Sequence, residues 1–252
     1  MSKHGTMFYV KHRVKDVLEF LNRMVNKDNI FTINHEGKKI KLYLPTKRDL
    51  LQQMIIVKRK FYEHEELSKL KKYIKPNSVI LDIGSNIGNH AVFFGKILEA
   101  KELYCFEPQR KMFDILTKNL KINNLDGVSK CYNIGIGNKE LMANIFVADK
   151  RNPGGGRVIE EDTGTVNIKP LDNVGISSKI DFIKIDVEGY EKQVLHGAEK
   201  ILKKDHPILF VETLEYLEDV KDYLKRFGYV LQENLRNYNY LFIYNKQKAN
   251  RS

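Results

Sequence analysis

The chain has 252 residues, of which 42% are hydrophobic and 30% charged, and it carries a formal net charge of +11. No stretch approaches the roughly 18 consecutive apolar residues that a membrane-spanning helix needs, and the first 20 residues lack the apolar segment of a secretory signal. We therefore expect one globular domain with additional segments, soluble and without membrane association.

The positive charge admits a nucleic-acid or phosphate partner. Lysines are scattered along the whole chain, however, which favours charge spread over solvated faces. The two cysteines, Cys105 and Cys131, lie in apolar, strand-like sequence. They are interpreted as buried thiols in a reducing compartment, so we expect a cytoplasmic protein.

Residues 1–75 are predicted to form an extension, made of a helix, a hairpin and further helical sequence, that packs on the rest of the chain. Apolar residues recur at helical spacing over 14–25. Residues 31–44 suit a hairpin that turns at Glu36-Gly37. Residues 48–74 are mostly helical sequence with one break.

Residues 76–245 alternate between short apolar strands and helices, which indicates a parallel sheet covered on both faces. The strands are expected at 78–84, 102–108, 128–137, 180–189, 207–213, 229–234 and 239–245, and the helices at 89–100, 109–124, 191–204 and 217–228. The last two strands are joined by too few residues for a crossover helix, so they should form an antiparallel hairpin. The fold predicted is α/β: a Rossmann-like, doubly wound, mostly parallel seven-stranded sheet, followed by a tail at 246–252.

Polar residues follow the first two strands, in the crevice where such sheets bind ligands. The first strand runs through Asp82 into Gly84, and a second glycine, Gly88, follows four residues later. Glycine permits a sharp turn and the close approach of a ligand. The second strand ends in Glu107-Pro108, where an acid can accept hydrogen bonds from both ribose hydroxyls. The pattern predicts a cofactor that contains a nucleoside.

The glycine loop differs from the dinucleotide fingerprint G-x-G-x-x-G, because Asn86 stands where the second glycine would be. A pyrophosphate needs that glycine for close backbone approach, and the charge of Asp82 would oppose it. S-adenosylmethionine fits better, since it has a ribose, an ammonium and a sulfonium but no phosphate. The motif resembles that of class I methyltransferases.

Four longer stretches, "DIGSNIGNH", "FEPQRKMFDILTKNLKINN", "IDFIKIDVEGYEKQVLHGAEKIL" and "PILFVE", resemble the FkbM-type methyltransferases. The most specific part runs from Lys184 to Ala198, and the similarity covers roughly residues 76–245, the expected methyltransferase domain. "FYEHEE" resembles the aromatic and acidic stretch that often precedes this domain, whereas Ser85 departs from the common alanine. The resemblance implies methyl transfer from S-adenosylmethionine to an oxygen, often a hydroxyl of a sugar or natural product. The expected cofactor-binding residues are Asp82, Gly84, Ser85, Asn86, Gly88, Glu107, Pro108, Asn133 and Asp186.

The acceptor side is expected at the end of the fourth strand, where Lys184, Asp186 and Glu188 point to one side. An alcohol needs a base to accept its proton, and Asp186, Glu188 and Glu212 are the candidates. These carboxylates could instead hold a divalent cation, so metal dependence stays open. Lys184 is a fourth candidate catalytic residue, with the alternative that it pairs with one of the acids or is structural.

Two further features have structural interpretations beside functional ones. His90 opens a helix after the glycine loop and could act as a base, although a histidine facing solvent or the sheet is favoured. "RNPGGGR" at 151–157 could cradle a phosphate, form a mobile loop over the acceptor or make a plain surface turn. The family resemblance favours the loop over the acceptor.

The leading hypothesis is an O-methyltransferase that acts on a small hydroxylated acceptor or a glycan. A ribose 2′-O-methyltransferase of RNA is the alternative, supported by the positive charge and by Lys184, Asp186 and Glu212. A non-catalytic interaction module is the third reading, but it predicts a damaged cofactor loop, which this chain does not have. The acceptor's identity and the oligomeric state are not fixed by the sequence.

Overall fold

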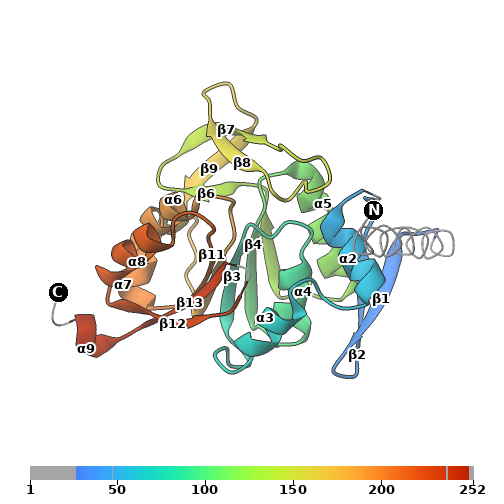
Figure 1. Ribbon diagram of the computed structural model, residues 1–252, viewed down its shortest axis with the longest axis horizontal. Helices are drawn as coiled ribbons and strands as arrows, with labels where there is room; N and C mark the ends of the chain where they lie inside the picture. The colour runs from blue at the N-terminus through green and yellow to red at the C-terminus, as the bar shows by residue number, and fades with distance from the viewer. Residues whose placement is uncertain (1–26, 47, 237, 250–252) are drawn as a thin grey trace, which may run out of the picture.

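The computed structural model describes residues 27–249, except residues 47 and 237, and its centre is a seven-stranded sheet (Figure 1). The strand order is β12-β13-β11-β10-β3-β4-β5. The strands are β3 (Val79–Ile83), β4 (Glu102–Phe106), β5 (Ser129–Tyr132), β10 (Phe182–Ile185), β11 (Ile208–Glu212), β12 (Tyr229–Asn234) and β13 (Asn239–Tyr244). All neighbours pair in parallel except β13, which is antiparallel to β11 and to β12. The predicted sheet and its C-terminal hairpin are confirmed.

Helices cover both faces of this sheet. Successive residues of a strand point to opposite sides, and because both sets are apolar here, both faces must be shielded from water. In β3, Ile80 packs in the cluster that contains α4 (Asn89–Lys96) and α5 (Arg110–Ile122). Its neighbour Leu81 packs in the cluster of the opposite face. That face is covered by α6 (Glu191–His196), α7 (Glu199–Asp205) and α8 (Leu217–Lys225), and a short helix, α9 (Lys246–Ala249), follows β13.

The predicted single helix at 191–204 is two helices, α6 and α7, that meet at Gly197. A Cβ atom on Gly197 would lie 1.8 Å from the carbonyl oxygen of Gly137. Glycine is therefore required where this helical segment packs against the backbone of β6 (Gly135–Gly137).

A second sheet of four strands stands at the top of the view in Figure 1. Its order is β6-β9-β7-β8, with β7 (Leu141–Phe146), β8 (Arg157–Glu160) and β9 (Val166–Pro170), and a 3₁₀ helix at Leu171–Asn173 leads back to the main sheet. The prediction of one strand over 128–137 is wrong, since β5 ends at Tyr132 and residues 135–137 belong to this second sheet. The glycines of β6 leave room for Ile168 of β9, which a Cβ atom on either would meet within 2.6 Å.

The extension contributes the hairpin β1 (Ile30–His35) and β2 (Lys38–Tyr43), followed by α2 (Leu50–Lys58) and α3 (His64–Leu70). The hairpin and the break between the helices are confirmed. The helix predicted over 14–25 lies outside the described residues. The domain boundary near residue 75 remains a prediction.

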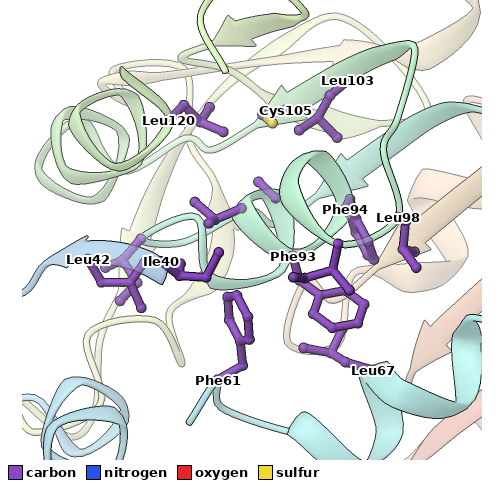
Figure 2. Packing of buried hydrophobic residues seen from close by; sticks show 14 of the residues in the cluster. Ile40, Leu42, Phe61, Leu67, Phe93, Phe94, Leu98, Leu103, Cys105 and Leu120 are labelled. Carbon is purple, nitrogen blue, oxygen red and sulfur yellow. The ribbon is translucent and has the colours of Figure 1, made fainter. Parts of the chain in front are cut away.

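Aromatic side chains join this extension to α4 (Figure 2). Phe61 meets Phe93 edge to face, with ring centroids 5.4 Å apart. Leu67 of α3 belongs to the same buried cluster, together with Ile40 and Leu42 of the hairpin. The helices of the described part of the chain include none that is both long and apolar enough to cross a membrane.

Candidate active site

The turn after β3 brings Gly84 against the turn after β10. Gly84 has φ +78°, and a Cβ atom there would lie 1.8 Å from the carbonyl oxygen of Asp186. Only glycine therefore permits these two turns to approach so closely. The hydroxyl of Ser85 donates to the carbonyl of Asp82 at 2.7 Å and Gly88 begins α4, so both shape the turn.

Glu107 lies at the carboxyl end of β4 with 4% of its surface exposed. Its carboxylate accepts hydrogen bonds from the backbone N–H groups of Asn86 and Gln109, both at 2.8 Å. Burial raises the pKa of Glu107 to about 7, against the lowering effect of those two bonds. Each carboxylate oxygen has a second lone pair, so a ligand hydroxyl can still bind there.

Asn133 holds the backbone beside Glu107. Its amide donates to the carbonyl oxygens of Glu107 and Pro108 at 2.8 and 3.0 Å. Pro108 lines a cavity at this edge of the sheet, whereas Asn133 lines none of the three cavities that meet there. The side chain of Asn133 therefore positions the end of β4.

Lys184 of β10 is buried, with 2% exposure, and its ammonium lies beneath the two turns. Nζ donates to the carbonyl oxygen of Gly84 at 2.8 Å, and it lies 2.9 Å from Asp186 and 3.4 Å from Asp82. Burial acts to lower the pKa of Lys184, but the two carboxylates outweigh it and the pKa is raised. Lys184 is thus a fixed cation that ties β3 to β10.

Asp82 is fully buried and does not line the cavities at this edge. Its carboxylate forms the 3.4 Å ion pair with Lys184, but within the described part of the chain no hydrogen-bond donor reaches either oxygen. Asp82 therefore makes its direct contact with Lys184 and none with the cavity.

Three carboxylates meet above Lys184. Asp186 and Glu188 follow β10, and Glu212 ends β11, the neighbouring parallel strand. Burial, reinforced by Asp186, raises the pKa of Glu188 to about 7. The same causes, with Glu63 in addition, raise the pKa of Glu212 to about 10. Both carboxyls therefore ionise less readily than exposed glutamates do.

These residues line one cavity of about 430 Å³. The cofactor candidates Gly84, Asn86 and Glu107 share it with the three carboxylates. Two smaller cavities, of about 50 Å³ each, adjoin it and contain Asp186 and Glu188 as well. The topology thus brings together residues at the ends of four separate strands, β3, β4, β10 and β11. The remaining lining residues are Leu50, Leu51, Met54, Tyr62, Asp149, Asn152 and Gly154.

The lining residues from α2 were not predicted, nor was Asp149, whereas Asn152 and Gly154 belong to the stretch 151–157 that was expected near the acceptor. Asp49 caps α2 by accepting from the N–H of Gln52 at 3.2 Å, and the N–H of Leu50 donates to the carbonyl of Arg151 at 2.8 Å. Gly154 packs directly on the amide of Asn86, where a Cβ atom would come within 2.2 Å of Nδ2. The glycine-rich stretch therefore lines the cavity through Asn152 and Gly154, and its role over the acceptor stays a prediction.

His90 lies away from the cavity. Its Nε2 is 3.3 Å from the carboxylate of Glu63, and its ring stacks on Phe94. His90 lines none of the three cavities, so it joins α4 to the extension at Glu63 and is not placed to act as a base.

The residues present fit a nucleoside cofactor. In the described chain no donor reaches the buried Oδ1 of Asn86, an acceptor that a bound ligand could satisfy. Glu107 is positioned by backbone bonds with lone pairs to spare. For a metal, residues 27–249 without 47 and 237 contain no group of three or more His, Cys, Asp or Glu side chains that could hold an ion.

Comparison with known proteins identifies a match to the methyltransferase FkbM domain over residues 82–231. "Methyltransferase 1" of Beauveria bassiana is 24% identical over 148 residues, which cover 49% of this chain and 59% of that protein. "Hexuronic acid methyltransferase AglP" of Haloferax volcanii is 27% identical over 145 residues, 56% of this chain and 58% of that protein. The chain thus spans less than two thirds of the length of these relatives.

A solved structure has the same fold. The methyltransferase FkbM of Methylobacillus flagellatus KT superposes with a TM-score of 0.50 at 17% identity, over 77% of this chain and 54% of the other. At this identity the superposition establishes a shared architecture.

Proposed function

Because the chain belongs to the FkbM methyltransferase family, we propose that it transfers a methyl group from S-adenosylmethionine to a hydroxyl of a small molecule or sugar. One observation carries this proposal. A single cavity of about 430 Å³ is lined both by the glycine turn with Glu107 and by the carboxylates of β10 and β11. Cofactor and acceptor could therefore meet inside it.

Gly84, Asn86 and Glu107 would hold the nucleoside. The buried carboxylate of Glu107 would accept the ribose hydroxyls, and Asn86 Oδ1 would accept a further hydrogen bond. S-adenosylmethionine would supply an electrophilic methyl group there. Lys184 would keep the carboxylate of Asp186 oriented toward the cavity, since their ion pair measures 2.9 Å.

Glu188 is the proposed general base. A base works best when its pKa lies near the working pH, and the pKa of Glu188 is raised to about 7. Glu212, whose pKa is raised to about 10 in the free protein, would orient the acceptor through a hydrogen bond. Four other predicted site residues would contribute indirectly, by holding the turns in place: Asp82, Ser85, Gly88 and Asn133.

The alternative acceptor is an RNA ribose, which the net charge of +11 favours. The carboxylates of the cavity oppose it, because they would repel the phosphates beside the reacting hydroxyl. RNA binding by the exposed lysines would weaken steeply with salt. A third reading, a non-catalytic module, predicts no cofactor binding.

The test begins with calorimetry of S-adenosylhomocysteine, followed by a methyl-transfer screen with labelled S-adenosylmethionine. Glycans, small alcohols and RNA serve as acceptors, with and without chelator. We expect label in an alcohol or glycan, lost in Glu188→Gln with cofactor binding retained. Glu218→Gln, an exposed change of equal charge on α8, is the matched control. Absence of cofactor binding at millimolar concentration would refute the enzyme, and label in RNA alone would replace the acceptor class.

The pH dependence gives a second readout. The rate should rise with pH through about 7, because Glu188 accepts a proton only when ionised. A rate that is flat between about pH 6 and about pH 8 would exclude Glu188 as the base.

A further inference from the structure

The cavity wall carries charge of a single sign. Five acidic residues line the cavity of about 430 Å³, and within the described part of the chain its lining contains no lysine, arginine or histidine. The five are Glu107, Asp149, Asp186, Glu188 and Glu212. The chemistry that enters this space must be compatible with a negative potential.

Three of these acids already have partners. Glu107 accepts two backbone N–H bonds. Asp149 forms an ion pair with Arg151 at 3.0 Å, and Asp186 pairs with Lys184 at 2.9 Å.

Glu188 and Glu212 form no ion pair with a basic side chain among the residues described. Arg157 lines an adjoining small cavity with both of them but pairs with Glu215 at 3.4 Å, and Lys184 is held by Asp186 and Asp82. Two carboxylates of the acceptor side are therefore available to a ligand.

A bound cofactor accounts for only one of them. S-adenosylmethionine has a sulfonium, an ammonium and a carboxylate, a net charge of +1. One positive charge balances one of them, and the other, whose ionisation is opposed in the free protein, would ionise beside a second positive group. The negative potential of the cavity therefore favours a second positive group, one that belongs to the acceptor.

Part of the lining is apolar, because Leu50, Leu51 and Met54 of α2 border the same space as the carboxylates. An acceptor in this cavity would place its carbon skeleton against α2 and its polar groups toward the strand ends.

Resting on the function proposed above, we propose that the acceptor is a hydroxyl compound with a positively charged amino group near that hydroxyl, an amino sugar or amino alcohol. Glu188 and Glu212 would bind the ammonium and the neighbouring hydroxyl. Uronates and phosphorylated acceptors would be rejected, because their charge would face the carboxylates with no free cation to balance it.

The test measures binding of three probes to the protein loaded with S-adenosylhomocysteine, by NMR titration at neutral pH. Glucosamine, N-acetylglucosamine and glucuronate share a pyranose ring but carry positive, zero and negative charge. Glucosamine should bind about tenfold tighter than N-acetylglucosamine, the scale of one partly solvated charge pair, and glucuronate should bind most weakly. The double variant Glu188→Gln/Glu212→Gln should lose this preference, whereas Glu218→Gln should keep it.

A second measurement tests whether the probes are distinguished by their charge or by the shape of their substituents. Glu212 should release its proton when a cation binds beside it, so calorimetry in buffers of different ionisation enthalpy should detect proton release with glucosamine only. Equal or tighter binding of glucuronate, or no saturable glucosamine binding, would overturn the charge inference. Loss of S-adenosylhomocysteine binding would instead overturn the proposed function on which the inference rests.

Discussion

Replacing Lys184 by methionine should be among the most destabilising single changes in the sheet. The ammonium is 2% exposed and makes hydrogen bonds of 2.8 Å to Gly84 and 2.9 Å to Asp186, with Asp82 at 3.4 Å. Methionine keeps most of the volume but leaves the fully buried carboxylate of Asp82 without a cation. Removing one partner of a buried ion pair costs about 3–5 kcal/mol, a large part of the 5–15 kcal/mol that stabilises a typical domain.

Urea unfolding followed by far-ultraviolet circular dichroism measures this loss, since the chain has no tryptophan to report it. The double variant Lys184→Met/Asp82→Asn should recover about 1 kcal/mol or more, because it removes the stranded charge. Lys192→Met is the matched control. Its pair with Asp219 is half-exposed, so the free energy of unfolding should change by less than about 1 kcal/mol. A loss below about 1 kcal/mol for Lys184→Met would refute the buried-cation argument.

Three further outcomes are expected. Glu107→Ala should weaken S-adenosylhomocysteine binding about tenfold to a hundredfold, from a lost charged acceptor worth about 1.5–3 kcal/mol; unchanged affinity in calorimetry would mean that the ribose binds elsewhere. Gly84→Ala should lower the melting temperature and abolish cofactor binding, because its Cβ would strike the Asp186 carbonyl at 1.8 Å; normal behaviour would show that the two turns can separate freely. Glu212→Gln should stabilise the free protein increasingly as pH rises from about 5.5 to about 8.5. The folded pKa of Glu212, about 10, exceeds its ordinary value of 4.5, so the wild type loses stability with rising pH across this window while glutamine cannot ionise; a pH-independent difference in melting temperature would contradict it.

The main sheet was predictable because its strands are short apolar runs separated by helices, and the order of such elements restricts the topology. The second sheet was not. β6 is only Gly135–Gly137, and its partner β9 is centred on Ile168, about thirty residues later. Glycines in a strand usually weaken a prediction, whereas here they make room for a neighbour that local sequence does not reveal.

The residues of the site likewise fall into those that the sequence predicts and those that it does not. Asp186, Glu188 and Glu212 were predictable as neighbours, since the carboxyl ends of parallel strands share one edge. Leu50 and Met54 were not, because α2 reaches the cavity only through long-range packing.

Individual side-chain roles were also hidden from the sequence. Asn133 could equally have faced a ligand, but its amide holds the backbone of Glu107 and Pro108. Asp82 is in the expected turn, yet the cation it faces is Lys184, a hundred residues away in β10. An amide or carboxylate suits several partners, and only the folded chain selects one.

The hydrogen bond from Leu50 to Arg151 has a consequence for the order of folding. It closes a chain segment of about a hundred residues. Such long segments close late in folding, because conformational entropy is lost before the contact can stabilise the closed segment. The pairing of β3 with β10 closes a segment of similar length, so the pocket should form no earlier than the centre of the main sheet. Cofactor added during refolding should then leave the early kinetic phases unchanged, so that its binding reports the completed pocket.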